Sequence, residues 1–329
     1  MNKFEVVKYI LQDKLELKDF NENAKVFAPT NIALCKYWGK RNQELNLPET
    51  SSLSISLDSL GAKTNIKVNK LAQDNIILNG DLVAKDSEFS KKLLAYLNLF
   101  RQQKNIYFDF EIESNIPIAA GLASSACGFA SIVKSLNALF NWNLSSTQLS
   151  ILARLGSGSA SRSIYNGFVE WHKGLRDDGM DSFAEPLDIK WPQLKIGLLM
   201  LSKAKKSISS RVAMQQTVET SMLYKAWPSQ VTRDLELIKS AIFTKNFELL
   251  GKTVENNALA MHATMLAAKP AISYCLPETL VQMQKIWALR DAGLDIYFTQ
   301  DAGPNLKLLY LERDKEKVVS EFNTLAVNC

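Results

Sequence analysis

An uncharged stretch from Asn115 to Val133 constrains the fold of this chain more than any other part of the sequence. It follows the alternating apolar run 106–112 and contains the segment PIAAGLASSA at residues 117–126. The stretch is about long enough to cross a bilayer, but its small residues and Pro117 favour a glycine-rich loop between a strand and a helix. Small residues let a phosphate approach the backbone, and the N–H groups at the helix N-terminus attract its negative charge.

The loop alone leaves two interpretations open. It lacks the lysine of a Walker A loop and the spacing of a G-x-G-x-x-G motif. A helix start made of small residues can also pack closely against a sheet without binding a ligand. The segment is therefore a candidate phosphate loop, and Ser124 and Ser125 are candidate donors to a phosphate or ligands of a magnesium ion.

Composition limits the class of protein. The 329 residues are 47% hydrophobic and 22% charged, which is ordinary for a globular chain of about two domains. A net charge of +5 suits an anionic small molecule, and no basic run with interleaved aromatics indicates nucleic-acid binding.

The chain has only two histidines, which excludes a histidine-rich metal site. The scattered cysteines and the charged N-terminus predict reduced thiols in a cytoplasmic protein without a membrane segment.

Hydrophobic periodicity predicts an α+β fold. Apolar and polar residues alternate over 62–68 and 106–112, Asn79-Gly80 marks a hairpin, and Ser145 with Gln148 forms a capping box. Strands cluster early in the chain, whereas helices lie between paired strands later, which predicts two α+β domains. We expect a helical extension over 1–24, a first domain over 25–190 and a second over 191–329. The second domain is expected to contain helices over 211–227, 231–243, 247–269, 278–292 and 314–327, and strands over 194–201, 294–299 and 306–311.

Four segments along the chain resemble those of one enzyme family. The glycine-rich segment resembles the phosphate loop of the GHMP small-molecule kinases. The segments APTNIALCKYWGKR (28–41), GSGSASRS (156–163) and DAGPN (301–305) are similar to signatures of the diphosphomevalonate decarboxylases within that superfamily. They follow the family's order and span nearly the whole chain apart from the N-terminal extension. One departure is Glu49-Thr50 before Ser51-Ser52, where the family more often has Asn directly before the serines.

The resemblance implies a GHMP-kinase-like two-domain fold with the active site in the cleft between the domains. It also implies a homodimeric enzyme that uses ATP and Mg²⁺ to phosphorylate the 3-hydroxyl of mevalonate diphosphate. Phosphate and carbon dioxide then leave, and isopentenyl diphosphate forms. A decarboxylase of mevalonate monophosphate and a mevalonate 3-kinase are close alternatives. A catalytically inactive nucleotide-binding regulator is a third, but such a protein is expected to lose Asp301 or the glycine-rich loop.

The resemblance further implies the site residues. Catalytic roles fall to Asp301, Lys40 and Arg162. Substrate binding is expected from Asn31, Tyr37, Lys40, Ser157, Ser159, Arg162, Ser210 and Arg211. The ATP phosphates are expected at Gly121, Leu122, Ala123, Ser124 and Ser125, with Ser124 as a magnesium ligand.

Several of these residues also have a purely structural interpretation. Asp301, between two apolar runs, can accept the hydroxyl proton or simply form an Asx turn. Lys40 can stabilise phosphates, hold Asp301 ionised, or lie solvated at the surface. Tyr37 can donate to the substrate or pack in the core. The basic stretch 203–211 precedes a helix and suits a diphosphate, or it is a solvated charge run in which Ser210 and Arg211 are the stronger candidates.

Overall fold

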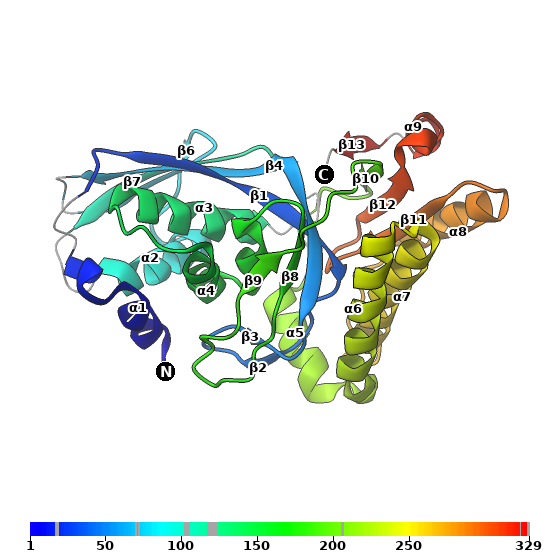
Figure 1. Cartoon of the computed structure of the whole chain (residues 1–329), viewed down its shortest axis with the longest axis horizontal. Coiled ribbons are helices and arrows are strands. Elements are labelled where there is room, and N and C mark those ends of the chain that lie inside the picture. The colour runs from blue at the N-terminus through cyan, green and yellow to red at the C-terminus, as the bar shows by residue number, and fades with distance from the viewer. Residues whose placement is uncertain are drawn as a thin grey trace.

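Two sheets divide the structure into two halves (Figure 1). The computed structural model describes residues 1–16, 20–69, 71, 73–101, 106–116, 124–204, 207–322 and 324–327. The first half contains a seven-stranded sheet and the second a four-stranded sheet, and helices pack against both. This arrangement confirms the predicted α+β class.

The seven-stranded sheet has the order β6-β5-β7-β4-β8-β9, and β1 pairs with β4 off this path. β5 pairs with β7 in parallel, whereas β4 is antiparallel to β1, β7 and β8. α3 lies against β1 and β4. The strands are β1 (Ala24–Cys35), β4 (Ser52–Asn69), β5 (Asn75–Leu78), β6 (Asp81–Leu82), β7 (Tyr107–Ser114), β8 (Phe168–Trp171) and β9 (Ala184–Pro186), and β2 (Lys40–Asn42) and β3 (Leu47–Pro48) form a separate hairpin. The helices of this half are α1 (Lys3–Leu11), α2 (Glu88–Arg101), α3 (Ser124–Leu139) and α4 (Ser146–Gly156), with 3-10 turns at Gln12–Glu16 and Gly158–Ile164.

The four-stranded sheet has the order β11-β12-β10-β13 and is antiparallel throughout. α7 and α8 contact β11, and α6 packs along α7. The strands are β10 (Leu194–Leu199), β11 (Ile296–Gln300), β12 (Leu306–Leu311) and β13 (Leu325–Val327). The helices are α5 (Ser210–Thr220), α6 (Trp227–Thr244), α7 (Phe247–Leu266), α8 (Pro277–Asp291) and α9 (Lys315–Phe322), with 3-10 turns at Met222–Ala226 and Glu312–Asp314.

Two local sequence signals are confirmed in atomic detail. Asn79 and Gly80 both have positive φ, 50° and 89°, at the turn between β5 and β6, as a tight hairpin requires. Ser145 accepts from the Gln148 backbone, and the Gln148 side chain accepts from the Ser145 backbone. This reciprocal pair starts α4, which ends at Gly156.

Two predicted helices are wrong in their extent. The helix expected over 211–227 ends at Thr220, and α6 begins at Trp227. Pro228 explains the restart, because proline lacks the N–H needed inside a helix but fits its first turn. The helix expected over 314–327 ends at Phe322. Residues 325–327 instead form β13, because they complete hydrogen bonds along β10.

The strand β1 takes part in two of the hydrophobic cores. Ala28 packs in the core of the first half, whereas Ile32 and Leu34 pack in a core that includes residues of α5, α6 and α7. A register shift against β4 separates the two parts at Pro29 and Thr30. The end of β1 is therefore held between the halves, where it can carry side chains into a shared site.

The structure contains no helix that is both long and apolar enough to cross a membrane, within the residues that it describes.

Glycine at one helical position allows α7 to approach β11. A methyl group at Gly251 would overlap the ring of Tyr297, whereas one at Gly128 of α3 would meet nothing within 4 Å. We expect Gly251→Ala to destabilise the protein by about 1–3 kcal/mol through overpacking. Gly128→Ala, the matched control, is expected to be neutral or to stabilise by about 0.5–1 kcal/mol through helix propensity. Denaturant unfolding measures both, and equal effects would contradict the packing argument.

Candidate active site

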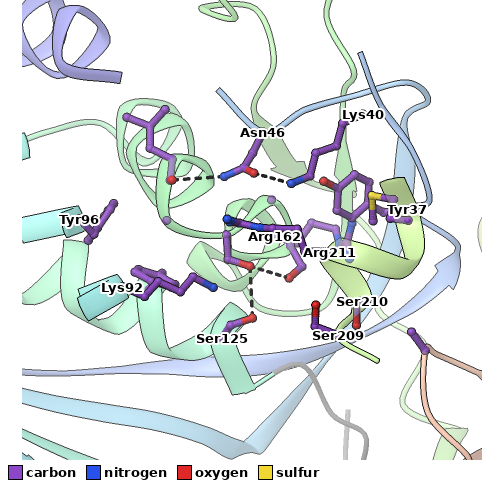
Figure 2. A pocket seen from close by; sticks show the side chains of 18 of the residues that line it. Tyr37, Lys40, Asn46, Lys92, Tyr96, Ser125, Arg162, Ser209, Ser210 and Arg211 are labelled. Atoms are coloured by element: carbon purple, nitrogen blue, oxygen red, sulfur yellow. Dashed lines mark hydrogen bonds between the residues drawn. The ribbon is translucent and has the colours of Figure 1, made fainter. Parts of the chain in front are cut away.

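Both halves line one cavity of about 940 Å³. The first half contributes the segment after β1, the start of α2 and the loop after α4, and the second half contributes the start of α5 and the turn between β11 and β12. Figure 2 shows Lys40, Lys92 and Arg211 reaching this space from β2, α2 and α5. Since these elements are far apart in the sequence, the site depends on the fold as a whole.

Asp301 lies at the cavity wall between two lysines. One carboxylate oxygen is 2.7 Å from Lys36 Nζ, and the other is 3.2 Å from Lys307 Nζ. The two lysine side chains are 2% and 1% exposed, while that of Asp301 is 26% exposed. Burial alone would raise the pKa of Asp301, but the two ammonium groups outweigh burial and hold it well below its usual value. The carboxylate is therefore ionised and aligned toward the cavity.

The backbone around Lys36 joins the two halves. Lys36 follows the last residue of β1, and its N–H donates to Asn257 Oδ1 of α7 at 2.8 Å. Asn257 in turn donates to Asp234 of α6 at 2.9 Å. The Lys36 ammonium also donates to the Ala33 carbonyl at 2.9 Å. These bonds fix both the backbone and the side chain of Lys36 before any ligand binds.

Lys36 and Lys307 were not among the predicted site residues, and Lys40 was expected to hold Asp301 ionised. In the structure Lys40 donates to Asn46 Oδ1 at 2.7 Å, and the ammonium groups on Asp301 belong to the other two lysines. A signal was present, because Lys307 interrupts the apolar run 306–311 and a lysine inside a strand requires a partner. Lys40 still lines the same cavity.

Gly39 allows the chain to turn between Tyr37 and Lys40. Its φ is 110°, a conformation that favours glycine, and a Cβ there would overlap the Tyr224 hydroxyl. Both Tyr37 and Lys40 line the cavity. The Tyr37 hydroxyl is buried and has no hydrogen-bond partner among the described residues. Burial raises the pKa of Tyr37, so this hydroxyl stays protonated and can donate a hydrogen bond to a ligand.

Arg162 and Asn31 are hydrogen-bonded to each other in the lining of the cavity. Arg162 donates from Nε and Nη2 to Asn31 Oδ1 at 3.3 and 3.2 Å, and from Nη1 to Ser52 Oγ at 2.6 Å. Asn31 donates to Ser163 Oγ at 2.7 Å. Burial lowers the pKa of Arg162 to about 10, so the guanidinium is charged at neutral pH. A preformed planar cation of this kind suits a carboxylate or a phosphate.

Three serine hydroxyls connect the start of α3 with the loop after α4. Ser157 Oγ lies 3.3 Å from Ser125 Oγ and 3.4 Å from Ser159 Oγ, as the dashed lines in Figure 2 indicate. All three residues line the cavity. The predicted ATP-phosphate and substrate-binding segments therefore meet here. Hydroxyl groups can rotate to donate hydrogen bonds to an anion, so these three serines could bind phosphate oxygens.

The start of α5 also faces the cavity. Ser209 caps the helix by accepting from the Val212 backbone at 3.3 Å. Ser210 and Arg211, which the sequence analysis preferred, both line the cavity in Figure 2. The predicted helix start near Arg211 is thus confirmed, while Lys205 and Lys206 lie outside the described residues.

The glycine-rich loop falls in a part of the chain that the structure does not describe. The predicted phosphate contacts Gly121, Leu122 and Ala123 lie outside the described residues. Ser124 begins α3, and Ser125 lines the cavity one residue later. The start of α3 therefore lies beside the serine group, and the N-terminus of a helix attracts an anion.

The charged groups around the cavity suit phosphates better than a protein-bound metal. Lys40, Lys92, Arg162 and Arg211 all line it. Among the described residues there is no group of three histidine, cysteine or acidic side chains that could hold a metal ion. Mg²⁺ commonly keeps several waters and binds through substrate phosphates. The residues present therefore fit a magnesium ion that arrives on a nucleotide.

Comparisons with known proteins show which family the chain resembles. Residues 28–184 match the family model for the diphosphomevalonate decarboxylase-like N-terminal domain, and residues 196–328 match that for the mevalonate 5-diphosphate decarboxylase C-terminal domain. The diphosphomevalonate decarboxylase of Aspergillus fumigatus is 36% identical over 92% of this chain and 80% of its own length.

Solved structures give the same result. The mevalonate diphosphate decarboxylase of Staphylococcus aureus has 36% identity and a TM-score of 0.88, covering 93% of this chain and 95% of its own. A structure of MDDEF in complex with MVAPP, AMPPCP and magnesium has 39% identity and a TM-score of 0.85, covering 93% and 96% of the two chains. The likeness confirms the predicted GHMP-kinase-like fold. Over nearly its whole length, therefore, the chain belongs to the diphosphomevalonate decarboxylase family.

Proposed function

We propose that this protein catalyses the ATP-dependent decarboxylation of mevalonate 5-diphosphate to isopentenyl diphosphate, with release of ADP, phosphate and carbon dioxide. The observation that carries this proposal is Asp301, held ionised by two buried lysines at the wall of a cavity rich in cations. The relatives that bear this activity in their names, and the MDDEF complex with MVAPP and an ATP analogue, support it. An inactive regulator has no need for such an arrangement.

The chemistry explains the requirement for ATP. A tertiary hydroxyl leaves a carbon poorly, whereas phosphate leaves well. The 3-hydroxyl oxygen attacks the γ-phosphorus, a new O–P bond forms, and ADP departs. Phosphate then leaves with the C–O electron pair, and positive charge develops at carbon 3. The electrons of the bond to the carboxylate form the alkene, and carbon dioxide is released.

Asp301 is proposed to orient the 3-hydroxyl. Its low pKa makes it a weak base, so its first task is to accept the hydrogen bond that aims the hydroxyl oxygen at phosphorus. Once the O–P bond forms, the hydroxyl becomes acidic and its proton passes to the carboxylate oxygen. Lys36 and Lys307 then keep the carboxylate in place through this change of charge.

The remaining groups bind two anionic ligands close together. We assign Arg162, oriented by Asn31, to the substrate carboxylate or to phosphate, because its guanidinium offers a planar pair of donors. The substrate diphosphate is assigned to Tyr37, Lys40, Ser157, Ser159, Ser210 and Arg211. The ATP phosphates are assigned to Gly121, Leu122, Ala123, Ser124 and Ser125, with Ser124 as a magnesium ligand. Magnesium supplies charge neutralisation on the phosphates when bound.

Three further proposals follow from the resemblance and the composition. We propose a homodimer and a cytoplasmic location, and domain bounds at residues 25–190 and 191–329 after an extension over 1–24. The two ranges matched by the family models, 28–184 and 196–328, support the bounds. Sedimentation equilibrium tests the homodimer, for which we expect twice the mass of one chain.

The number of phosphates on the substrate tests the proposed reaction directly. Purified protein is incubated with ATP, magnesium and mevalonate carrying zero, one or two phosphates, and inorganic phosphate and carbon dioxide are measured together. We expect mevalonate diphosphate to react far faster than the monophosphate, because the cavity presents several cations to the second phosphate. Faster reaction of the monophosphate would assign the protein to that substrate, and phosphorylation without carbon dioxide would make it a 3-kinase.

Replacing Asp301 separates chemistry from binding. Asp301→Asn keeps the size and the turn-forming ability of the side chain but removes its charge. We expect kcat to fall by roughly 10²–10⁴-fold, with phosphate and carbon dioxide release falling together and the KM values little changed. Asp295→Asn, which removes an exposed carboxylate paired with Arg313, is the control and should keep the wild-type rate. A folded Asp301→Asn protein with normal turnover would refute the role.

The protonation of Lys40 predicts a pH dependence. Burial, and secondly the charge of Arg211, lower the pKa of Lys40 to about 8 in the free protein. The protonated form binds phosphate, so kcat/KM for mevalonate diphosphate should decrease as the pH rises from 7 to 9. Lys40→Arg keeps its charge over this range and should flatten the decrease. Superimposable pH profiles of the two proteins would show that Lys40 is not the titrating group.

A further inference from the structure

The N-terminal helix α1 lies outside the segments that match the family models, since the first match begins at residue 28. Nevertheless Lys3, the first residue of α1, lines the same cavity as Lys40, Arg211 and Asp301. We propose that Lys3 is an additional binding residue for the diphosphate group of the substrate, supplied by the N-terminal extension. This inference rests on the proposed function and adds a residue to the site.

Helix α1 is firmly placed. Asn2 and Glu5 form a capping box at its start, with hydrogen bonds of 2.8 and 2.9 Å. Val6, Val7, Ile10 and Leu11 are buried in the core of the first half, and α1 contacts α2 and α4. Figure 1 places α1 beside these two helices. The position of Lys3 at the cavity therefore follows from packing along the whole helix.

A hydrogen bond ties the start of α1 to the hairpin that carries Lys40. The Lys3 N–H donates to Glu44 Oε1 at 3.4 Å, and Glu44 lies in the turn between β2 and β3. Lys40 is the first residue of β2. The extension thus contacts the same short hairpin that positions one of the proposed diphosphate ligands.

Lys3, Lys40, Lys92 and Arg211 form a group that we call the basic cluster. Among the described residues, the side chains of Lys3, Lys92 and Arg211 form no ion pair, and Lys40 donates to the neutral Asn46. Burial and, next, the charge of Arg211 lower the pKa of Lys3 and of Lys92. The charge of Glu44 raises the pKa of Lys3 and so opposes this lowering. A second carboxylate, that of Glu88, lines the cavity. An anion with several charges would relieve this repulsion.

The position of Lys3 favours the substrate diphosphate over ATP. Lys3 is joined through Glu44 to the hairpin that carries Lys40, and the charge of Arg211 acts on both lysines. Lys40 and Arg211 are the cations assigned above to the substrate diphosphate. Phosphate groups of ATP have the same chemistry, so the experiment must distinguish the two ligands.

The test compares Lys3→Met, Lys3→Arg and Lys8→Met with the wild-type protein. Lys8 is exposed on the same helix and is absent from the cavity lining, so it is a matched control. With ATP and magnesium saturating, we expect Lys3→Met to raise the KM for mevalonate diphosphate by roughly three- to tenfold, with kcat nearly unchanged. Lys3→Arg and Lys8→Met should keep the wild-type KM. The dependence of kcat/KM on salt should become shallower in Lys3→Met alone.

Calorimetric titration with inorganic pyrophosphate gives a readout that is independent of turnover. We expect weaker pyrophosphate binding by Lys3→Met and unchanged binding by Lys8→Met, at equal melting temperatures. An unchanged KM and unchanged pyrophosphate affinity in Lys3→Met would overturn the inference. So would a rise in the KM for ATP alone, or an equal loss in Lys3→Arg. Failure of the wild-type protein to decarboxylate mevalonate diphosphate would instead refute the proposed function, whatever the pyrophosphate result.

Discussion

The proposed active site depends on one ion cluster, in which Lys36 and Lys307 each contact one of the two carboxylate oxygens of Asp301. Charges buried in protein are costly unless they are paired, and removal of one partner of a buried pair typically destabilises a protein by about 3–5 kcal/mol. Lys36 follows β1, whereas Asp301 and Lys307 belong to the β11–β12 region of the other half. The cluster therefore joins the two halves at the site where we propose that the substrate reacts.

Positive charge is in excess throughout the cavity. The cluster itself has two cations and one anion, and Lys40, Lys92, Arg162 and Arg211 add to it. Burial, and after it the charges of Arg211, Lys3 and Lys92, lower the pKa of Lys40 in the free protein. Anionic ligands offset this excess of positive charge. Electrostatic preorganisation of this kind acts without rearrangement at the moment of reaction.

Local signals in the sequence predicted local structure well. The Asn79-Gly80 turn and the Ser145 capping box depend on neighbours within a few residues, and both are present. Motif resemblance predicted which segments meet at the site. Lys36 was missed because its partner, Asp301, is far from it in the chain and no local pattern encodes that contact. Lys307 was missed although a signal for it was present, because it interrupts an apolar run. The C-terminal strand was not predicted either, because residues 325–327 become a strand only through pairing with β10, which is distant in the sequence.

The long strands β1 and β4 have a consequence for the integrity of the chain. Each contributes residues to the core of the first half and also, through Ile32 or Leu53, to the core around α5, α6 and α7. A fragment that stops at residue 190 would leave those apolar faces in water, and a fragment that starts at 191 would lack the strands that cover its helices. Neither piece would bury all of these apolar side chains on its own. Cleavage of the chain near residue 190 would yield two fragments that must associate to be stable, although the sequence predicts a domain boundary at that point.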